Sequence, residues 1–324
     1  MIHEAILAAT GASDLKELET IQELWSGYGT IKRYELSGSK IKRVVVKHVD
    51  VPESSNHPRG WNSDISHQRK LKSYKIELEW YKNWSERLDA DCYVPRAYGF
   101  KSSKSSNSSL LILEDLDEAG FTLRKKSVSL TQAKNCLSWL ANFHASFLGE
   151  APKGLWTTGT YWHLDTRPDE LEALDDIALK QAAAAIDQKL RDCPFQSLVH
   201  GDAKLANFCF SPNGEAVSAV DFQYVGGGCG MKDVAYFIGS CFSEKDCERH
   251  EEELLDFYFA NLVKHVSEKH SDVDADELCH FWRELFPFAW ADFHRFIKGW
   301  SPGHWKINSY SERVAREVVA NLCS

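Results

Sequence analysis

The pattern of hydrophobic and polar positions divides this chain into a strand-rich first third and a helical remainder. Short runs of β-branched and aliphatic residues, such as Ile41–Val49 and Ser109–Leu113, predict strands. Longer segments at 67–88 and 129–148 carry apolar residues three and four positions apart, which predicts amphipathic helices. From residue 234 onward the hydrophobic segments have helical spacing. The pattern therefore predicts an α+β protein with a small β-rich lobe and a larger, mainly helical lobe.

The first 25 residues have a helical spacing of their own. Apolar residues in Ser13–Leu24 recur at intervals of three and four, so we expect one or two helices here, capped by Ser13 or Asp14. A turn containing Gly27 and Gly29 follows and leads into a strand. Backbone N–H groups at these glycines would be able to approach phosphates.

Two segments of the first third are polar and rich in turn-forming residues. Residues 50–64 contain Pro, Ser, Asn and Gly, and are expected to form a mobile loop that is a candidate lid. Residues 101–109 are dominated by Ser and Lys and predict a hairpin connection.

The chemistry of the chain is concentrated in Leu198–Phe210, whose sequence is LVHGDAKLANFCF. Asp202 is followed five residues later by Asn207, and Asp221 stands at the end of a second short apolar run. The turn-forming residues Ser211–Gly214 lie between the two runs and predict a hairpin. Such a hairpin would bring Asn207 and Asp221 to neighbouring strand ends.

This arrangement is typical of a phosphoryl-transfer site. Asp202 would take the proton of an attacking hydroxyl, while Asn207 and Asp221 would hold Mg²⁺ against the phosphates of ATP. Lys204 would reach the transferred phosphate as a point charge. The His200–Asp202 segment alone would be interpreted as a polar turn, and the run that ends at Asp221 alone as a strand end. Their combination indicates a site.

The same residues resemble the catalytic and metal loops of the protein-kinase-like fold. His200-Gly-Asp202 resembles the small-molecule branch: choline and ethanolamine kinases, aminoglycoside phosphotransferases and the ecdysteroid-kinase-like group. The last group fits best, and the matches run from about Gly27 to Phe237. They are carried by Asp221-Phe-Gln223, Asp233-Val-Ala-Tyr-Phe237, Leu140-Ala-Asn-Phe-His-Ala145 and Leu111-Ile-Leu-Glu-Asp-Leu116.

The resemblance implies a division into lobes. Residues 1–114 would form the N-lobe, residues 115–120 the hinge, and residues 121–324 a helical C-lobe with the catalytic and metal loops and the acceptor site.

The resemblance also implies further roles in binding ATP. Lys47 would be the phosphate-binding lysine, and Glu77, rather than its neighbour Glu79, would be the partner of Lys47. The backbone at Glu114, Asp115 and Leu116 would bind the adenine edge.

His200 and Asp233 would give structural support, because Asp233 would brace the His200 loop. Gln223 departs from the glycine that protein kinases have at this position, and the glycine turn at Gly27 is a weak match.

Composition excludes several classes of protein. The 324 residues carry a net charge of −9, which disfavours nucleic acid as the main partner. No apolar run is long enough to span a bilayer, and the start of the chain has no signal-peptide pattern. Nine cysteines without a C-x-x-C pair are expected to be reduced thiols in a cytoplasmic protein.

Three alternatives stay open beside a small-molecule kinase that uses ATP and Mg²⁺. A protein kinase would need a longer segment than the glycine-rich Val225–Gly230 that follows Asp221. A pseudokinase would bind nucleotide without turnover, and the departure at Gln223 keeps it open. A metal-dependent hydrolase built on His200, Asp202 and Asp221 would need further His or carboxylate ligands at close spacing, and the sequence offers no convincing set.

The sequence does not identify the molecule that accepts the phosphate. The stretch 286–305 is dense in aromatic residues, most of which must serve the helical core. Trp290, Trp300 and Trp305 are the candidates for an acceptor pocket, where rings would hold a quaternary ammonium or a flat apolar molecule. Steroids, choline, sugars and antibiotics are all compatible. His144, inside the helix predicted at 129–148, is expected to be a core residue rather than a catalyst.

Overall fold

The computed structural model describes residues 2–24, 27–50, 64–103 and 108–322. The expected lid at 50–64 lies almost entirely outside these residues, and of the connection at 101–109 only residues 104–107 lie outside them. The chain forms two compact units. The first comprises Met1–Arg87, Tyr93–Leu123 and Cys209–Gln223, and the second comprises Leu88–Cys92, Arg124–Phe208 and Tyr224–Ser324. The lobe boundary predicted at residue 114 stays a prediction, and Cys209–Gln223 groups with the first unit.

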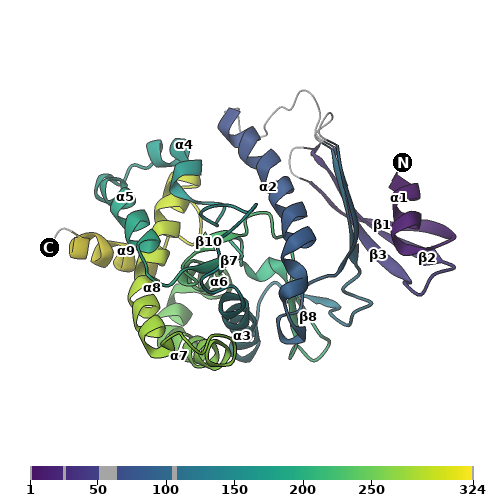
Figure 1. Ribbon diagram of the computed structural model, residues 1–324. Helices are drawn as coiled ribbons and strands as arrows, with labels where there is room; N and C mark the ends of the chain where they lie inside the picture. Colours follow the sequence, from purple (N-terminus) through teal and green to yellow (C-terminus); the bar gives the residue numbers. More distant parts are fainter. Residues whose placement is uncertain (1, 25–26, 51–63, 104–107, 323–324) are drawn as a thin grey trace. The chain divides into compact units, whose positions relative to one another are not determined.

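The first unit is built on a five-stranded antiparallel sheet with the strand order β1-β2-β3-β5-β4 (Figure 1). Two helices belong to the same unit. The elements are α1 (Ile2–Thr10), β1 (Asp14–Glu23), β2 (Gly29–Ser37), β3 (Arg43–Val49), α2 (Asp64–Asn83), a short 3₁₀ turn (Ser85–Arg87), β4 (Ala97–Ser102) and β5 (Ser109–Glu114). A further three-stranded sheet has the order β6-β8-β9, with β6 at Leu123–Arg124, β8 at Phe208–Phe210 and β9 at Val217–Ala219. Its β8-β9 pair is the hairpin that the sequence predicts.

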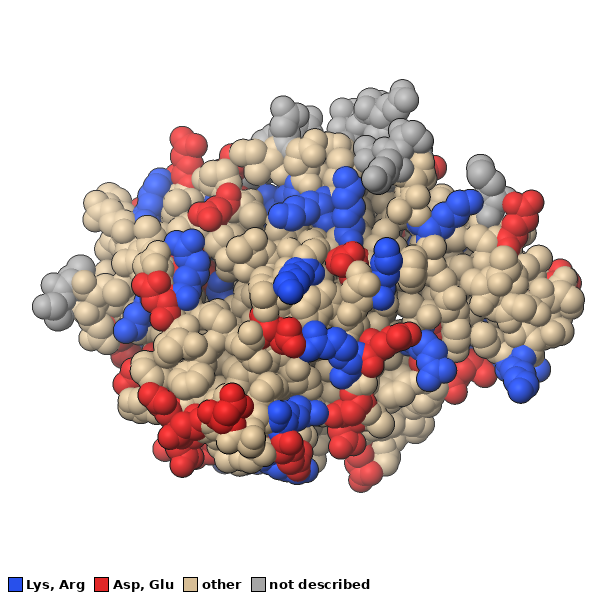
Figure 2. Space-filling view, viewed as in Figure 1, with Lys and Arg blue, Asp and Glu red and all other residues tan. Residues whose placement is uncertain are grey.

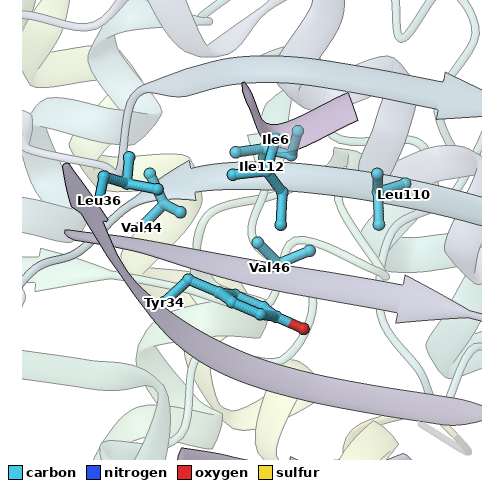
Figure 3. Close-up of a cluster of buried hydrophobic side chains, with 7 residues drawn as sticks. All are labelled: Ile6, Tyr34, Leu36, Val44, Val46, Leu110 and Ile112. Carbon is cyan, nitrogen blue, oxygen red and sulfur yellow. The ribbon is translucent and has the colours of Figure 1, made fainter. Parts of the chain in front are cut away.

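A cluster of buried side chains joins α1 to the sheet. Ile6 of α1 lies against Val44 and Val46 of β3 and Ile112 of β5 (Figure 3). Val44 and Val46 are two residues apart, so they point to the same face of the strand. Lys47 therefore points to the opposite face, as the sequence predicts.

The helix expected over Ser13–Leu24 is wrong, because most of this segment is the edge strand β1. The pairing of β1 with β2 shifts register between Glu17 and Glu19 and again between Thr20 and Gln22. Leu18 and Ile21 are thus the extra residues of two β-bulges, and they are 42% and 45% exposed. Because each bulge adds one residue, the apolar residues of this strand stand three positions apart. This spacing is also typical of a helix, which explains the wrong prediction.

Helix α2 carries the aromatic core that meets the segment after β9. Trp80 is fully buried and stacks on Phe222, with ring centres 4.5 Å apart and planes 14° apart. Tyr81 contacts the edge of the same Phe222 ring. Phe222 is thereby fixed, and so are its neighbours Asp221 and Gln223.

The second unit is mainly helical (Figure 1). Its helices are α3 (Leu130–Ser146), α4 (Pro168–Glu172), α5 (Ile177–Arg191), α6 (Met231–Cys241), α7 (Glu244–Lys269), α8 (Ala275–Trp300) and α9 (Ser309–Leu322), with 3₁₀ turns at Ala90–Cys92, Leu164–Thr166 and Leu205–Asn207. Helix α3 begins with a capping box formed by Ser129 and Gln132. Helix α8 continues through Pro287, so most of the aromatic stretch 286–305 is helical.

Two short strands hold the catalytic stretch in place. β7 (Ser197–Val199) pairs antiparallel with β10 (Gly226–Gly228). The glycine-rich segment after Asp221 is therefore a strand in part, rather than only a loop. At Gly226 a Cβ atom would lie 2.2 Å from the carbonyl oxygen of Trp156, so only glycine fits this close backbone approach.

The β-rich first unit and the helical second unit confirm the predicted α+β fold class. Acidic and basic side chains are interspersed on the face shown in Figure 2. Within the ranges that the structure describes, no helix is long and apolar enough to cross a membrane.

Candidate active site

The Asp202 carboxylate is held by two side chains of its own loop in the second unit. Its Oδ2 atom accepts from Lys204 Nζ at 2.8 Å and from Asn207 Nδ2 at 3.0 Å. The Asn207 amide nitrogen also donates to the Asp202 carbonyl oxygen at 2.8 Å. Asp202 is 5% exposed, so these donors fix the carboxylate in a largely desolvated place. The three residues thus form one hydrogen-bonded group, as their spacing suggests.

Tyr236 of α6 contacts the other oxygen of Asp202. Its hydroxyl donates to Oδ1 at 3.3 Å, which is longer than either bond at Oδ2. Burial raises the pKa of Tyr236 well above its usual value, and the Asp202 charge raises it further. The hydroxyl therefore stays protonated and can act only as a donor toward the carboxylate.

Asp233 braces this loop from the first turn of α6. Its carboxylate accepts from the backbone N–H of His200 at 2.5 Å and from that of Gly201 at 2.9 Å. Asp233 is fully buried, and the N-cap of the helix is Gly230. Its carboxylate thus holds the loop, as the resemblance implies, and does not cap the helix.

His144 is the third partner of Asp233. Its Nε2 lies 3.2 Å from Asp233 Oδ2, and its Nδ1 lies 2.8 Å from the hydroxyl of Tyr258. The ring is fully buried and both nitrogens have partners. The structure agrees with the expectation of a satisfied core histidine, and it adds that the residue supports the brace.

The loop conformation requires a glycine after His200. Gly201 has φ +79°, and a Cβ there would lie 2.1 Å from the carbonyl oxygen of Tyr224. The Nδ1 atom of His200 accepts from the Asp202 N–H at 3.2 Å. His200 and Gly201 together set the direction in which Asp202 leaves the strand β7.

The first unit contains a separate charged group. Lys47 Nζ lies 2.6 Å from Glu77 Oε2 and 3.5 Å from Asp221 Oδ1. Burial alone would lower the pKa of Lys47, but the two carboxylates outweigh it and raise the pKa. Lys47 therefore remains an ammonium in a buried place. Glu79, the alternative candidate, accepts a bond from the exposed Asn83 instead.

Asp221 has a backbone conformation that is rare outside glycine. Its φ is +69°, in the left-handed region, and Thr160 is the other non-glycine residue with positive φ among those described. Such strain persists only where the surroundings impose it, and it is concentrated at functional sites. Here the stacked Phe222 and the bonds of Gln223 supply the constraint.

Gln223 links Asp221 to helix α2. Its Nε2 donates to Asp221 Oδ1 at 2.6 Å, and its Oε1 accepts from Lys70 Nζ at 2.8 Å and Ser73 Oγ at 3.0 Å. Gln223 is 5% exposed. The departure from the protein-kinase glycine is thus a side chain that orients Asp221.

The predicted hinge residues have well-defined contacts. The Asp115 carbonyl oxygen accepts from Glu118 and Ala119, and the Leu116 carbonyl accepts from Phe121. The buried Asp115 carboxylate pairs with Arg33 Nε at 2.8 Å. The turn after β5 is therefore fixed by its own backbone and by β2.

The glycine turn has a structural explanation of its own. Gly27 has φ +69°, and its N–H donates to the carbonyl oxygen of Leu24 at 3.1 Å. A Cβ at Gly29 would lie 2.0 Å from the carbonyl oxygen of His48. Both glycines serve the turn before β2, and their contact with phosphate stays a prediction.

The three candidate tryptophans have different surroundings. Trp290 is buried and donates to Ser311 Oγ at 3.1 Å. Trp300 stacks on Phe296, while Trp305 is 58% exposed and stacks on His304. Trp290 also lines a small pocket of the second unit together with Phe293 and other residues of α6 and α8. The structure does not join the three rings into one cluster.

Sequence reasoning missed the contacts of Tyr236 and Lys70. Tyr236 belongs to the motif that begins at Asp233, three residues away, and therefore lies on the same side of α6. Lys70 lies seven residues, or about two helical turns, before Glu77 on α2, and this spacing was the signal for it.

Comparison with known protein families shows which family this chain belongs to. The model of the ecdysteroid kinase-like family matches residues 66–149 and 157–270, more than half of the chain. The chain belongs to this family. It is thereby a member of the protein-kinase-like small-molecule kinases, which confirms the resemblance and, at this level, the prediction of a small-molecule kinase. No curated protein matches the chain in sequence.

Solved structures share the fold at low sequence identity. A candidate aminoglycoside phosphotransferase from Ralstonia eutropha JMP134 is 14% identical with a TM-score of 0.51, covering 98% of this chain and 94% of its own. Choline kinase from Cryptosporidium parvum Iowa II is 12% identical with a TM-score of 0.51, covering 96% and 89%. At these identities the likeness supports the kinase-like fold and nothing finer.

Proposed function

We propose that this protein transfers the γ-phosphoryl group of ATP to a hydroxyl group of a small molecule, with Mg²⁺ bound. The observation that carries the proposal is the buried Lys47–Glu77 pair beside Asp221. A lysine held by a glutamate next to a metal-binding aspartate is the arrangement that kinases use to position nucleotide phosphates. A purely structural role would not require the ammonium of Lys47 and the carboxylate of Glu77 in a desolvated place, where charges are costly, beside the partly exposed Asp221.

In this proposal the nucleotide lies against the first unit. Lys47 would bind the α- and β-phosphates as a point charge, and Glu77 would keep it aimed at them. The N–H of Leu116 donates to no residue among those described, so it is suited to bind the adenine edge together with the backbone of Glu114 and Asp115.

The proposed metal ligands are Asn207 and Asp221. The Asn207 amide nitrogen donates to Asp202, which leaves its amide oxygen to act as a ligand. Amide and carboxylate oxygens suit Mg²⁺, which also takes ligands from nucleotide phosphates. Among the described residues no cluster of three or more His, Cys, Asp or Glu would hold a metal by itself, which fits a metal that needs ATP for its remaining ligands. Bound Mg²⁺ would neutralise charge on the phosphates.

Asp202 is the proposed general base. The acceptor hydroxyl would approach the Asp202 carboxylate, whose Oδ2 accepts from Lys204 and Asn207 and whose Oδ1 accepts from Tyr236. Lys204 would then stabilise charge that develops on the transferred phosphoryl group. Tyr236 and the Asp233 brace would keep the carboxylate in position.

The proposal also includes a small molecule as the phosphate acceptor and the cytoplasm, a reducing compartment, as the location of the enzyme. The segment after Asp221 is short and partly held as β10, which suits a small acceptor better than a docked polypeptide. Cys92 and Cys136 are fully buried thiols, which fits a cytoplasmic enzyme.

The test is transfer of labelled γ-phosphate from ATP into a pooled metabolite extract. Asp202→Asn is the matched inactive variant, because it keeps the volume of the side chain but removes the base. Binding of MgATP is measured in parallel by calorimetry on both proteins. A labelled product made by the wild type and lost in the variant supports the proposal. MgATP binding without any product across extracts and alcohol panels would contradict it and indicate a pseudokinase.

A further inference from the structure

Lys306 lies on an aromatic surface next to the Asp202 carboxylate. It belongs to the segment between α8 and α9, and its Nζ lies 4.6 Å from the ring centre of Tyr236 and 5.1 Å from that of Phe293. The Tyr236 hydroxyl is the group that donates to Asp202 Oδ1. A single aromatic ring thus separates this ammonium from the proposed base. All of these residues belong to the second unit.

The Lys306 ammonium has no close carboxylate partner. Among the described residues, no carboxylate oxygen lies within ion-pair distance of it, and its ring contacts are Tyr236, Phe293 and, at 5.7 Å, Trp305. Burial lowers the pKa of Lys306 to about 8, although the Asp202 charge opposes this shift. The amine is therefore mainly charged at neutral pH, and its side chain is only half-buried. A half-buried ammonium without a carboxylate partner is stabilised when an oxygen atom of a ligand accepts a hydrogen bond from it.

The same lysine lines the small pocket between α6 and α8. Trp290 and Phe293 contribute rings to this pocket, and Asn308 and Ser311 contribute polar groups. An acceptor whose hydroxyl reaches Asp202 would meet Lys306, which is itself one of the lining residues of this pocket.

A permanently cationic acceptor fits this surface poorly. The ring faces of Tyr236 and Phe293, which would attract a quaternary ammonium, already carry the protein's own ammonium. Lys204 lies on the other side of Asp202 with a second positive charge. A cationic acceptor would therefore be repelled by two lysines and would find its aromatic partners occupied.

We propose that Lys306 binds the phosphate acceptor, and that the acceptor presents a neutral or anionic oxygen there instead of a fixed positive charge. This inference rests on the proposed function and narrows it, because it removes choline-like molecules from the acceptors that the sequence left open. The ammonium would donate to a carbonyl, hydroxyl, ether or carboxylate oxygen of the acceptor.

The experiment divides the metabolite extract by charge before the labelled ATP is added. A cation-exchange resin separates cationic metabolites from the rest, and an anion-exchange resin then separates anionic from neutral ones. The inference predicts that the wild-type protein labels a product in the neutral or anionic fraction and none in the cationic fraction. Label that appears mainly in the cationic fraction would overturn the inference and leave the proposed function standing. No label in any fraction would overturn the proposed function, and the inference with it.

Variants of Lys306 then test the residue itself on the isolated acceptor. Lys306→Met keeps the length and removes the charge, and it should raise KM for the acceptor at least tenfold while kcat and the KM for ATP change by less than threefold. Lys306→Arg should restore most of the affinity. Lys264→Met, which removes an exposed lysine of α7, is the matched control and should behave as the wild type. An unchanged acceptor KM in a folded Lys306→Met protein would contradict the assignment.

Discussion

The amide nitrogen of Gln223 donates to the carboxylate of Asp221 at 2.6 Å, and this bond ties the proposed metal ligand to helix α2. Both Lys70 and Ser73 of α2 donate to the other end of the same amide. The sequence marked Gln223 only as a departure from the protein-kinase pattern. In the structure it orients the Asp221 carboxylate and, with the stacked Phe222, constrains the left-handed conformation of Asp221.

Replacing Gln223 with Leu should weaken the response to Mg²⁺. The variant keeps the approximate volume but removes the bond that orients Asp221, and loss of such a supporting bond costs about 10–100-fold in metal affinity. The measurement is the Mg²⁺ dependence of ATP binding, followed by calorimetry. Gln188→Leu on the exposed face of α5 is the control, and equal Mg²⁺ dependence in both variants would refute the role of Gln223.

The Lys47–Glu77 pair should show strong coupling in a double-mutant cycle. Lys47→Met leaves Glu77 buried without its main partner, and breaking a buried pair in this way costs about 3–5 kcal/mol of unfolding free energy. Lys47→Met/Glu77→Gln removes both charges and should recover a large part of that loss, while ATP binding stays weak. Urea unfolding and nucleotide binding measure the two effects. A double variant as unstable as Lys47→Met would show that the pair is not coupled.

Asp233→Ala should impair both stability and catalysis. The substitution leaves the N–H groups of His200 and Gly201 without their acceptor, at a cost of about 1–3 kcal/mol for each unsatisfied buried group. The loop that carries Asp202 should then lose its fixed position, so kcat should fall more than the affinity for ATP. Asp276→Ala removes an exposed acidic residue from the first turn of α8 and serves as the control. If kcat were equal in the two variants, the brace would be unnecessary for catalysis.

His294 should make the fold sensitive to acid. Burial lowers the pKa of His294 to about 4, although Glu312 opposes this, and Lys298 and Asp176 are the other charges that act on the ring. Between the usual value of about 6.5 and 4 the unfolded chain binds the proton more readily than the folded one. The free energy of unfolding should therefore fall as the pH falls through this window, by at most about 3 kcal/mol.

The measurement is urea unfolding at several pH values between 7 and 5. His294→Asn should flatten the dependence, because the variant has no group that titrates there. His280→Asn, an exposed position on the same helix, should leave the slope unchanged. A slope that persists in His294→Asn would assign the acid sensitivity to other groups.

Local spacing was enough to find the catalytic loop and the strand that carries Lys47. Asp202, Lys204 and Asn207 lie within six residues of each other, so their contacts follow from one loop. The choice of Glu77 over Glu79 came from the resemblance, and the ion pair with Lys47 agrees with it.

What the sequence did not reveal depends on pairing and on distant contacts. Strand β1 has helical spacing because two bulges insert Leu18 and Ile21, and a bulge is visible only once the partner strand is known. Lys306 lies near Asp202 because it packs on Tyr236 of α6 and Phe293 of α8, and no local sequence pattern predicts contacts between such distant residues.

The Asp233 brace also determines how this protein would lose activity on heating. Residues 231–238 of α6 are all buried, so the Asp233 carboxylate that accepts from the His200 and Gly201 amides lies in a fully buried part of this helix. Many enzymes lose catalysis through early local opening of a loop, because functional loops belong to the least stable regions. Here the base-carrying loop should exchange its amide hydrogens as slowly as the surrounding core. Thermal inactivation would then coincide with global unfolding of the helical unit instead of preceding it.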